Sequence, residues 1–138
     1  MRLHKDTKVD LLKGVPLFAS CSKAELQRIA SLADELDLAD GATLIREGER
    51  GREFIVVVEG SVRVTRSGKT LRDLGAGDFI GEIALVSDVP RTATVTAVTP
   101  VRLLVVTDRA FRGLIEEMPS IATKVLQSLG ERLHADAV

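Results

Sequence analysis

The chain has 138 residues, of which 45% are hydrophobic and only 3% aromatic, with no Trp or Tyr. This length and apolar content predict one folded domain with an aliphatic core and argue against a disordered chain. The formal net charge is −1, from 19 basic and 20 acidic residues, which argues against a direct nucleic-acid partner, because such proteins present basic surfaces and aromatic stacking platforms.

No segment of the sequence predicts a secretory or membrane destination. The stretch from Met1 to Asp10 is polar and charged, unlike a signal peptide. No apolar run approaches the roughly 20 residues that span a bilayer. Cys21 is the only cysteine, so no intramolecular disulfide can form. We therefore expect a cytoplasmic protein without a membrane span.

The beginning of the chain predicts a helical lead over about residues 9–33. Ser22 and Glu25 have the spacing of a capping box, in which the two side chains satisfy the first backbone N–H groups of a helix. The helix that follows has apolar residues at positions i, i+3, i+4 and i+7, which predicts one buried face formed by Leu26, Ile29, Ala30 and Ala33.

Between about residues 34 and 107 the pattern changes to short strands separated by turns. Residues 54–58 are a continuous apolar run, which fits a buried strand. Residues 61–65 alternate, and the Ser67-Gly68 pair that follows indicates a hairpin. Short strands with Gly-rich turns at regular spacing predict a mainly β sandwich or jelly-roll barrel of about eight strands.

Residues 80–93 combine groups that suit the capture of a small phosphate ester. Gly81 allows backbone N–H groups to approach an anion closely, and the first turn of a helix exposes unpaired N–H groups. Arg91 adds a planar, bidentate donor for phosphate oxygens, whereas Glu82 is a pure acceptor that suits a sugar hydroxyl or balances Arg91. Thr92 offers a hydroxyl to the phosphate or to a base edge. The structural alternative for Arg91 is a salt bridge to Glu82 or Asp88.

Beyond residue 107 the sequence predicts two helices, over about residues 108–135. Pro119 separates the first helix from the last. The last helix has an apolar stripe at steps of four residues, formed by Ile121, Val125, Leu129 and Leu133. Such a stripe packs on the barrel or pairs with another subunit.

The stretch at residues 80–93 closely resembles the phosphate-binding cassette of cyclic nucleotide-binding domains. The matching segments are Ile80-Gly81-Glu82-Ile83-Ala84-Leu85 and Pro90-Arg91-Thr92-Ala93-Thr94-Val95. Ile80 departs from the family pattern, which has an aromatic residue there. The resemblance covers about residues 10–135 and includes three glycines that we interpret as tight-turn positions rather than ligand contacts: Gly48, Gly51 and Gly60. It implies a single domain over residues 1–138, with a jelly roll between N-terminal helices and two C-terminal helices.

The resemblance also implies roles for individual residues. In the family the glutamate holds the ribose 2′-hydroxyl and the arginine holds the cyclic phosphate, which corresponds here to Glu82 and Arg91. The ligand-binding set that it implies is Gly81, Glu82, Ile83, Ala84, Arg91, Thr92 and Ala93. The C-terminal helices of the family move when nucleotide binds, and the last one often covers the base. The candidates for that contact are Val125, Leu126 and Leu129.

We interpret the chain as a regulatory sensor module that binds cAMP and needs no cofactor. The ligand cGMP remains possible, because the hydroxyl of Thr92 can reach a guanine amino group, while a likeness to bacterial single-domain members favours cAMP. Ligand binding is expected to reposition the C-terminal helices. The output is then expected to pass to a separate effector protein, a fused domain or a second copy in a homodimer.

Other functions are less well supported by the residues. A degenerate domain that acts by protein contact without nucleotide is the main alternative, although the presence of Glu82, Arg91 and Ala93 argues against it. A cupin-type metalloenzyme needs clustered His and carboxylate ligands, whereas His4 and His134 stand at the two ends. Because the chain has only these two histidines, it also lacks the residues for a Ser-His-Asp or Cys-His catalytic site. We therefore expect no enzyme activity. A DNA-binding domain after the last helix, as in transcription regulators of the family, is not expected within this chain.

Overall fold

The computed structural model describes residues 3–136, with side chains for residues 3–131, and the chain divides into two compact units. The β unit is Asp34–Asp108, and the helical unit combines Met1–Ala33 with Arg109–Val138. In the described part of the chain, none of the helices has the length and apolarity needed to cross a membrane.

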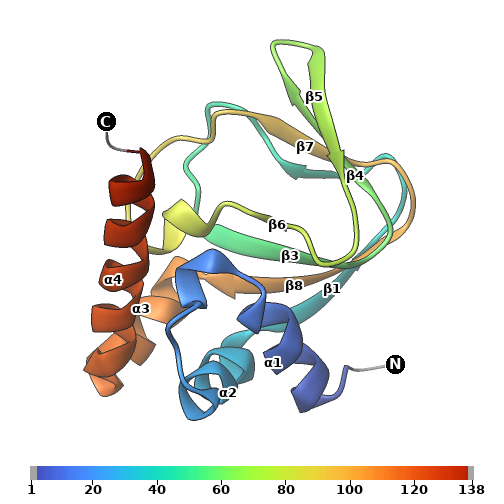
Figure 1. The fold of residues 1–138 in the computed structure, drawn as a ribbon. Coiled ribbons are helices and arrows are strands. Elements are labelled where there is room, and N and C mark those ends of the chain that lie inside the picture. The colour runs from blue at the N-terminus through green and yellow to red at the C-terminus, as the bar shows by residue number, and fades with distance from the viewer. Residues whose placement is uncertain (1–2, 137–138) are drawn as a thin grey trace. The chain divides into compact units, whose positions relative to one another are not determined.

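The β unit consists of two antiparallel sheets of four strands each, within the residues that the structure describes (Figure 1). The first sheet has the order β1-β8-β3-β6 and the second has the order β2-β7-β4-β5. The strands are β1 Asp34–Leu38, β2 Thr43–Ile45, β3 Glu53–Glu59, β4 Val62–Arg66, β5 Lys69–Leu74, β6 Phe79–Ile80, β7 Thr94–Ala97 and β8 Val101–Thr107. The expected fold class, a jelly roll of about eight strands with helices before and after it in the chain, is confirmed.

An aliphatic core holds the β unit together. Apolar residues that alternate along the strands point from both sheets into it, as the period of two in a strand requires. The buried members are Ile45, Ile55, Val57, Val62, Val64, Val95, Ala97, Val101 and Leu103. The apolar run predicted as a buried strand is β3, which lies between β8 and β6 and is paired on both sides.

The helical unit contains α1 Lys5–Lys13, η1 Pro16–Phe18, α2 Lys23–Leu32, α4 Pro119–Asp136 and, apart from its first residue, α3 Asp108–Glu117. The first helix begins at Lys5, four residues before the expected start of the helical lead. The predicted capping box is confirmed: the Ser22 N–H donates to Glu25 Oε1 at 2.8 Å, and the Glu25 N–H donates to Ser22 Oγ at 3.2 Å. Pro119 is the first residue of α4, where its fixed φ is favourable and no helical N–H is lost.

The carboxylate of Glu25 joins α2 to α4 inside the helical unit. Glu25 is 3% exposed. Besides its capping bond it accepts a hydrogen bond from Ser120 Oγ at 2.6 Å and forms an ion pair with Lys124. Burial by itself raises the pKa of Glu25, but the hydrogen bonds from Lys124, Ser120 and Ser22 outweigh it and lower the pKa to about 2. The buried charge is therefore fully supplied with donors.

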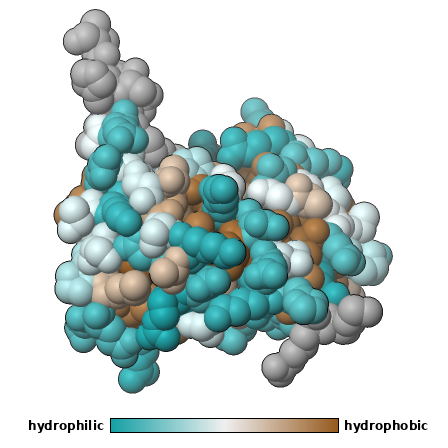
Figure 2. All heavy atoms as spheres, turned by 60° about the horizontal axis from the view of Figure 1, so that its bottom comes forward, coloured by the Kyte–Doolittle hydropathy of each residue, from teal (hydrophilic) through white to brown (hydrophobic). Residues whose placement is uncertain are grey.

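The face of the molecule shown in Figure 2 is mostly hydrophilic, with hydrophobic atoms visible in small areas between polar side chains. Several large apolar side chains of the described residues are nevertheless exposed, namely Leu36, Leu71, Ile83, Val86, Val89, Val98 and Leu126. Single exposed apolar residues are normal on a protein surface. Ile83 and Val89, however, also line the pocket described next.

Candidate functional site

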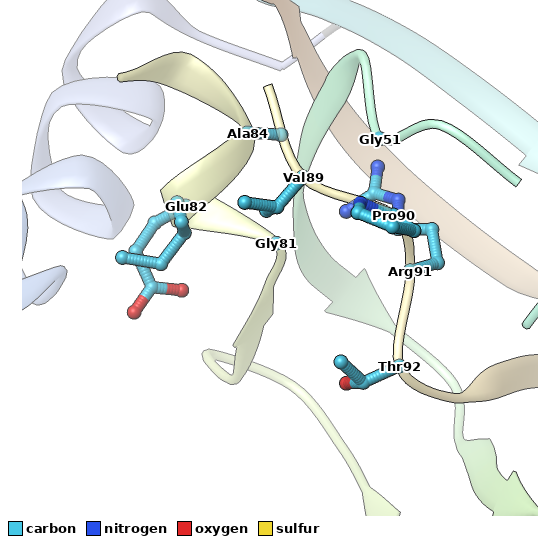
Figure 3. A pocket seen from close by; sticks show the side chains of 9 residues that line it. Gly51, Gly81, Glu82, Ala84, Val89, Pro90, Arg91 and Thr92 are labelled. Atoms are coloured by element: carbon cyan, nitrogen blue, oxygen red, sulfur yellow. The ribbon is translucent and has the colours of Figure 1, made fainter. Parts of the chain in front are cut away.

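The residues of the predicted cassette come together around an open pocket of about 270 Å³ in the β unit (Figure 3). Its lining consists of Gly51, Gly81, Glu82, Ile83, Ala84, Val89, Pro90, Arg91 and Thr92. Six of the seven predicted ligand-binding residues are in this set. The seventh, Ala93, packs against the aliphatic core instead. Gly51, Val89 and Pro90 line the pocket without having been predicted as site residues.

One wall of the pocket is positioned by the pairing of β3 with β6. Ile55 pairs with Ile80, which places the next residue, Gly81, beside the start of β3. Gly81 has a φ of 77°, a left-handed conformation that glycine adopts without the Cβ penalty of other residues. The chain then forms the short 3₁₀ helix η2, Glu82–Leu85. The Ala84 N–H donates to the Gly81 carbonyl at 3.0 Å, so this N–H closes the turn.

The opposite wall is held by backbone hydrogen bonds to the turn between β2 and β3. The Gly48 N–H donates to the Arg91 carbonyl at 2.8 Å, and the Arg91 N–H donates to the Glu49 carbonyl at 2.7 Å. The Gly51 N–H donates to the Val89 carbonyl at 3.4 Å. Both main-chain polar groups of Arg91 are therefore hydrogen-bonded to the turn between β2 and β3, and these bonds hold the Arg91 backbone without a ligand.

The guanidinium of Arg91 is largely buried and faces Glu53 at the start of β3. Its side chain is 10% exposed. Arg91 Nη2 donates to the Glu53 carbonyl at 2.5 Å and lies 3.6 Å from Glu53 Oε2. Burial lowers the pKa of the Arg91 guanidinium, against the opposing attraction of Glu53. The suggested salt bridge of Arg91 to Glu82 or Asp88 is wrong, because Glu53 is the partner and Asp88 pairs with Arg50.

Two glycines leave the space that the Arg91 guanidinium occupies. A Cβ on Gly51 would lie 2.8 Å from Arg91 Nε, and a Cβ on Gly81 would overlap the guanidinium and lie 3.1 Å from the Glu53 carbonyl. Gly48 was interpreted as a turn glycine, and its φ of 85° with open space around it agrees. The same interpretation of Gly51 is wrong, because its φ is not in the left-handed region and its missing side chain makes room for Arg91.

The polar side chains predicted to share the ligand point in different directions. In Figure 3 the Glu82 carboxylate points away from the Arg91 guanidinium, and Thr92 lies on a third side of the pocket. This separation suits a ligand with chemically different parts, because a cationic group, a carboxylate and a hydroxyl then meet different ligand atoms.

The predicted base-covering residues are on α4, in the helical unit. Val125 is 2% exposed, Leu126 is 68% exposed and Leu129 is half-buried. Val125 is therefore committed to packing, whereas Leu126 presents its side chain to solvent. Among the residues that the structure describes, no group of three or more His, Cys, Asp or Glu residues is placed to hold a metal ion.

Comparison with known proteins gives matches over most of the chain. The profile of the cyclic nucleotide-binding domain family matches residues 35–118. The regulatory subunit of a cAMP-dependent protein kinase from Mycosarcoma maydis is 36% identical over 139 residues, covering 91% of this chain and 26% of its own. A cyclic nucleotide-gated potassium channel from Rhizobium etli is 38% identical over 122 residues, covering 88% of this chain and 34% of its own. The chain thus spans about a quarter to a third of the length of these curated relatives.

A solved structure extends the match to three dimensions. The crystal structure of the N-terminal domain of a transcriptional regulator from Streptomyces coelicolor has a TM-score of 0.86 and 33% sequence identity. The alignment covers 92% of this chain and 94% of that domain.

Proposed function

The chain belongs to the cyclic nucleotide-binding domain family, and from this membership we propose that it is a regulatory sensor module that binds cAMP in the pocket around Arg91. The observation that carries the proposal is the state of the Arg91 guanidinium. It is almost buried at a pocket wall, yet its partners are one carbonyl and a carboxylate at 3.6 Å. A planar cation with incomplete pairing is well suited to a phosphate, which takes two parallel N–H donors.

The remaining site residues are expected to contact the ribose and the other atoms around the phosphate of a cyclic nucleotide. Glu82 accepts a hydrogen bond from the ribose 2′-hydroxyl, in keeping with a carboxylate that points away from Arg91 (Figure 3). Gly81, Ile83 and Ala84 form the wall that faces the phosphate and sugar. The side chain of Ala93 packs against the aliphatic core. We therefore propose that Ala93 contacts the ligand through its backbone.

Two observations bear on the choice between cAMP and cGMP. The Mycosarcoma maydis relative is named as a cAMP-dependent regulatory subunit, which favours cAMP. The Thr92 hydroxyl at the pocket edge can accept a hydrogen bond from a guanine amino group, which makes cGMP the competing ligand. The comparison of the two nucleotides therefore belongs in the first experiment.

The proposed output is a ligand-dependent change in the position of α3 and α4. Leu126 has the exposed apolar side chain expected of a residue that covers a base only when ligand is present. A ligand shifts such an equilibrium only by binding the two positions with different affinity. The receiver is a separate effector, a fused domain or a second copy of the chain, since the relatives include a kinase regulatory subunit, a channel and a transcriptional regulator.

The test is calorimetric titration of purified, demonstrably nucleotide-free protein with cAMP, then with cGMP, and with 5′-AMP as the control. We expect micromolar or tighter binding of cAMP, weaker binding of cGMP and little response to 5′-AMP, which lacks the cyclic phosphate. Tighter binding of cGMP would correct the ligand and leave the site in place. Folded protein that gives no heat and no thermal shift with any of the three would contradict the proposal and favour a partner-binding module without nucleotide.

A further inference from the structure

Arg66, at the end of β4, makes a hydrogen bond that reaches the rim of the pocket. Its Nε donates to the carbonyl of Thr92 at 2.9 Å. Thr92 lines the pocket directly after Arg91. The pairing of β4 with β7 ends at Thr65 and Thr94, so Thr92 lies beyond the last backbone pair. A side chain, rather than the sheet, therefore restrains the Thr92 backbone.

A second set of bonds ties the same corner together through Glu47. The Glu47 N–H donates to Thr94 Oγ1 at 3.0 Å, and Glu47 Oε1 accepts from the Ser67 N–H at 3.0 Å. Ser67 has a φ of 51° and Gly68 a φ of 79°, so the turn that follows Arg66 is tight and left-handed. Arg66 thus extends from a strand end whose turn is anchored to the segment that also holds Arg91 through Gly48.

From this arrangement we infer that Arg66 is a positioning residue: its bond to the Thr92 carbonyl fixes the Thr92 backbone at the rim of the pocket, places the Thr92 hydroxyl there and thereby sets the preference between cAMP and cGMP. The inference rests on the proposed function. The phosphate contact is supplied by Arg91, whose backbone has its own restraints, so loss of the Arg66 bond changes discrimination between bases more than capture of the phosphate. Arg66 acts through Thr92 and makes no contact with the ligand itself.

The chain offers a matched control on the same strand. Arg63 also lies exposed on β4, but its guanidinium is paired with Asp73 at 2.9 Å and 3.1 Å, and it is not among the pocket-lining residues. Replacing Arg63 removes an arginine and its bonds from the hairpin without touching Thr92. Arg66→Lys is a second comparison, because lysine keeps a donor that can reach a carbonyl.

The experiment measures the dissociation constants of cAMP and cGMP for wild type, Arg66→Met, Arg66→Lys, Thr92→Val, the Arg66→Met/Thr92→Val double variant and Arg63→Met, with thermal unfolding of each. Loss of one hydrogen bond predicts a change of about three- to tenfold in the cAMP-to-cGMP ratio for Arg66→Met. The double variant should show no further change, because both replacements remove the same Thr92 contact. Arg66→Lys should recover part of the wild-type ratio, and Arg63→Met should keep it.

Three results would overturn the inference. An unchanged ratio in Arg66→Met, while wild type binds nucleotide, would show that Arg66 does not set the preference. Effects of Arg66→Met and Thr92→Val that multiply in the double variant would show that Arg66 acts independently of Thr92. Wild type that binds neither nucleotide would contradict the proposed function itself, and the inference would fail with it.

Discussion

Two buried charges, one in each unit, are treated differently by this protein. In the helical unit, the Glu25 carboxylate is 3% exposed and accepts hydrogen bonds from Ser22 and Ser120 besides its ion pair with Lys124. In the β unit, the Arg91 side chain is 10% exposed but has one carbonyl contact and one longer ion pair, both from Glu53. Both groups are charged, with opposite sign, and both are largely buried, but Glu25 has more hydrogen-bonding and ionic partners than Arg91.

This difference in the number of partners fits a structural role for the charge of Glu25 and a ligand-binding role for the charge of Arg91. A buried ion costs several kcal/mol of desolvation unless hydrogen bonds and an opposite charge replace water. Glu25 has that replacement, and its lowered pKa shows that the charged form is favoured. Burial lowers the pKa of Arg91, so its charged form is disfavoured by its surroundings. In the proposed complex, the cyclic phosphate would supply the acceptors that Arg91 lacks.

The largest expected effect comes from Arg91→Ala. Loss of the main phosphate partner is expected to cost about 3–5 kcal/mol of binding free energy, or a hundredfold or more in cAMP affinity. The free energy of unfolding should change little, because the buried guanidinium is incompletely paired. Calorimetry and urea denaturation measure the two quantities. Arg102→Ala, which removes an arginine paired with Asp37 on β1, should keep wild-type affinity. If Arg91→Ala bound cAMP with wild-type affinity, Arg91 would not be the phosphate-binding residue.

The converse is expected for Glu25→Ala. Removal of the carboxylate leaves the Lys124 ammonium and the Ser120 hydroxyl without their buried partner and should lower the free energy of unfolding by about 3 kcal/mol. Urea denaturation at neutral pH measures it. The control is Glu117→Ala, which breaks an ion pair with Arg28 whose side chains are 51% and 68% exposed, and which should cost less than about 1 kcal/mol. Equal losses in the two variants would make Glu25 an ordinary surface charge.

Acidification should expose the same contribution in the wild-type protein. The pKa of Glu25 is lowered from 4.5 to about 2, so folding favours the charged form. The resulting stabilisation, on the order of 3 kcal/mol, is present above pH 4.5 and is lost as the pH falls toward 2. The difference in unfolding free energy between wild type and Glu25→Gln should therefore shrink over this range. A difference that stays constant down to pH 2 would contradict the lowered pKa.

A smaller effect on the pocket is expected from Gly51→Ala. The added Cβ would lie 2.8 Å from Arg91 Nε, and overpacking of this kind costs about 1–3 kcal/mol. Because the guanidinium is the group displaced, we expect cAMP affinity to fall about tenfold. Gly75→Ala is the control, since neither glycine has a left-handed φ and a Cβ on Gly75 meets only the Gly60 carbonyl at 3.9 Å. Equal affinities in the two variants would mean that Gly51 is only a turn residue.

The smallest effect is expected from Leu126→Ala. The side chain is 68% exposed, so the free energy of unfolding should stay within about 0.5 kcal/mol of wild type. If Leu126 covers the base, cAMP affinity should fall severalfold, by about 1 kcal/mol. Val125→Ala should do the opposite, because Val125 is 2% exposed and its loss leaves a cavity. If Leu126→Ala bound cAMP with unchanged affinity, Leu126 would not be a base-covering residue.

The sequence predicted the parts of this protein that depend on local patterns. The capping box at Ser22 and Glu25, the apolar run that became β3 and the six clustered cassette residues all follow from spacing within a short segment. The features that could not be predicted from the sequence depend on contacts between segments that are far apart along the chain. Glu53 lies 38 positions before Arg91, and no periodicity connects them. Gly51 resembles any turn glycine until the Arg91 side chain is found beside it, and the role of Glu25 beyond its cap depends on Lys124, 99 positions later.

The proposed phosphate site is tested by following the Nε–Hε signal of Arg91 by NMR while nucleotide is added to the wild-type protein. The signal is assigned by its absence in Arg91→Lys. We expect cAMP to shift this signal strongly as the phosphate approaches the guanidinium, and 5′-AMP to leave it nearly in place. A protein that binds cAMP while the Arg91 signal stays unmoved would contradict the claim that this incompletely paired charge is the phosphate site.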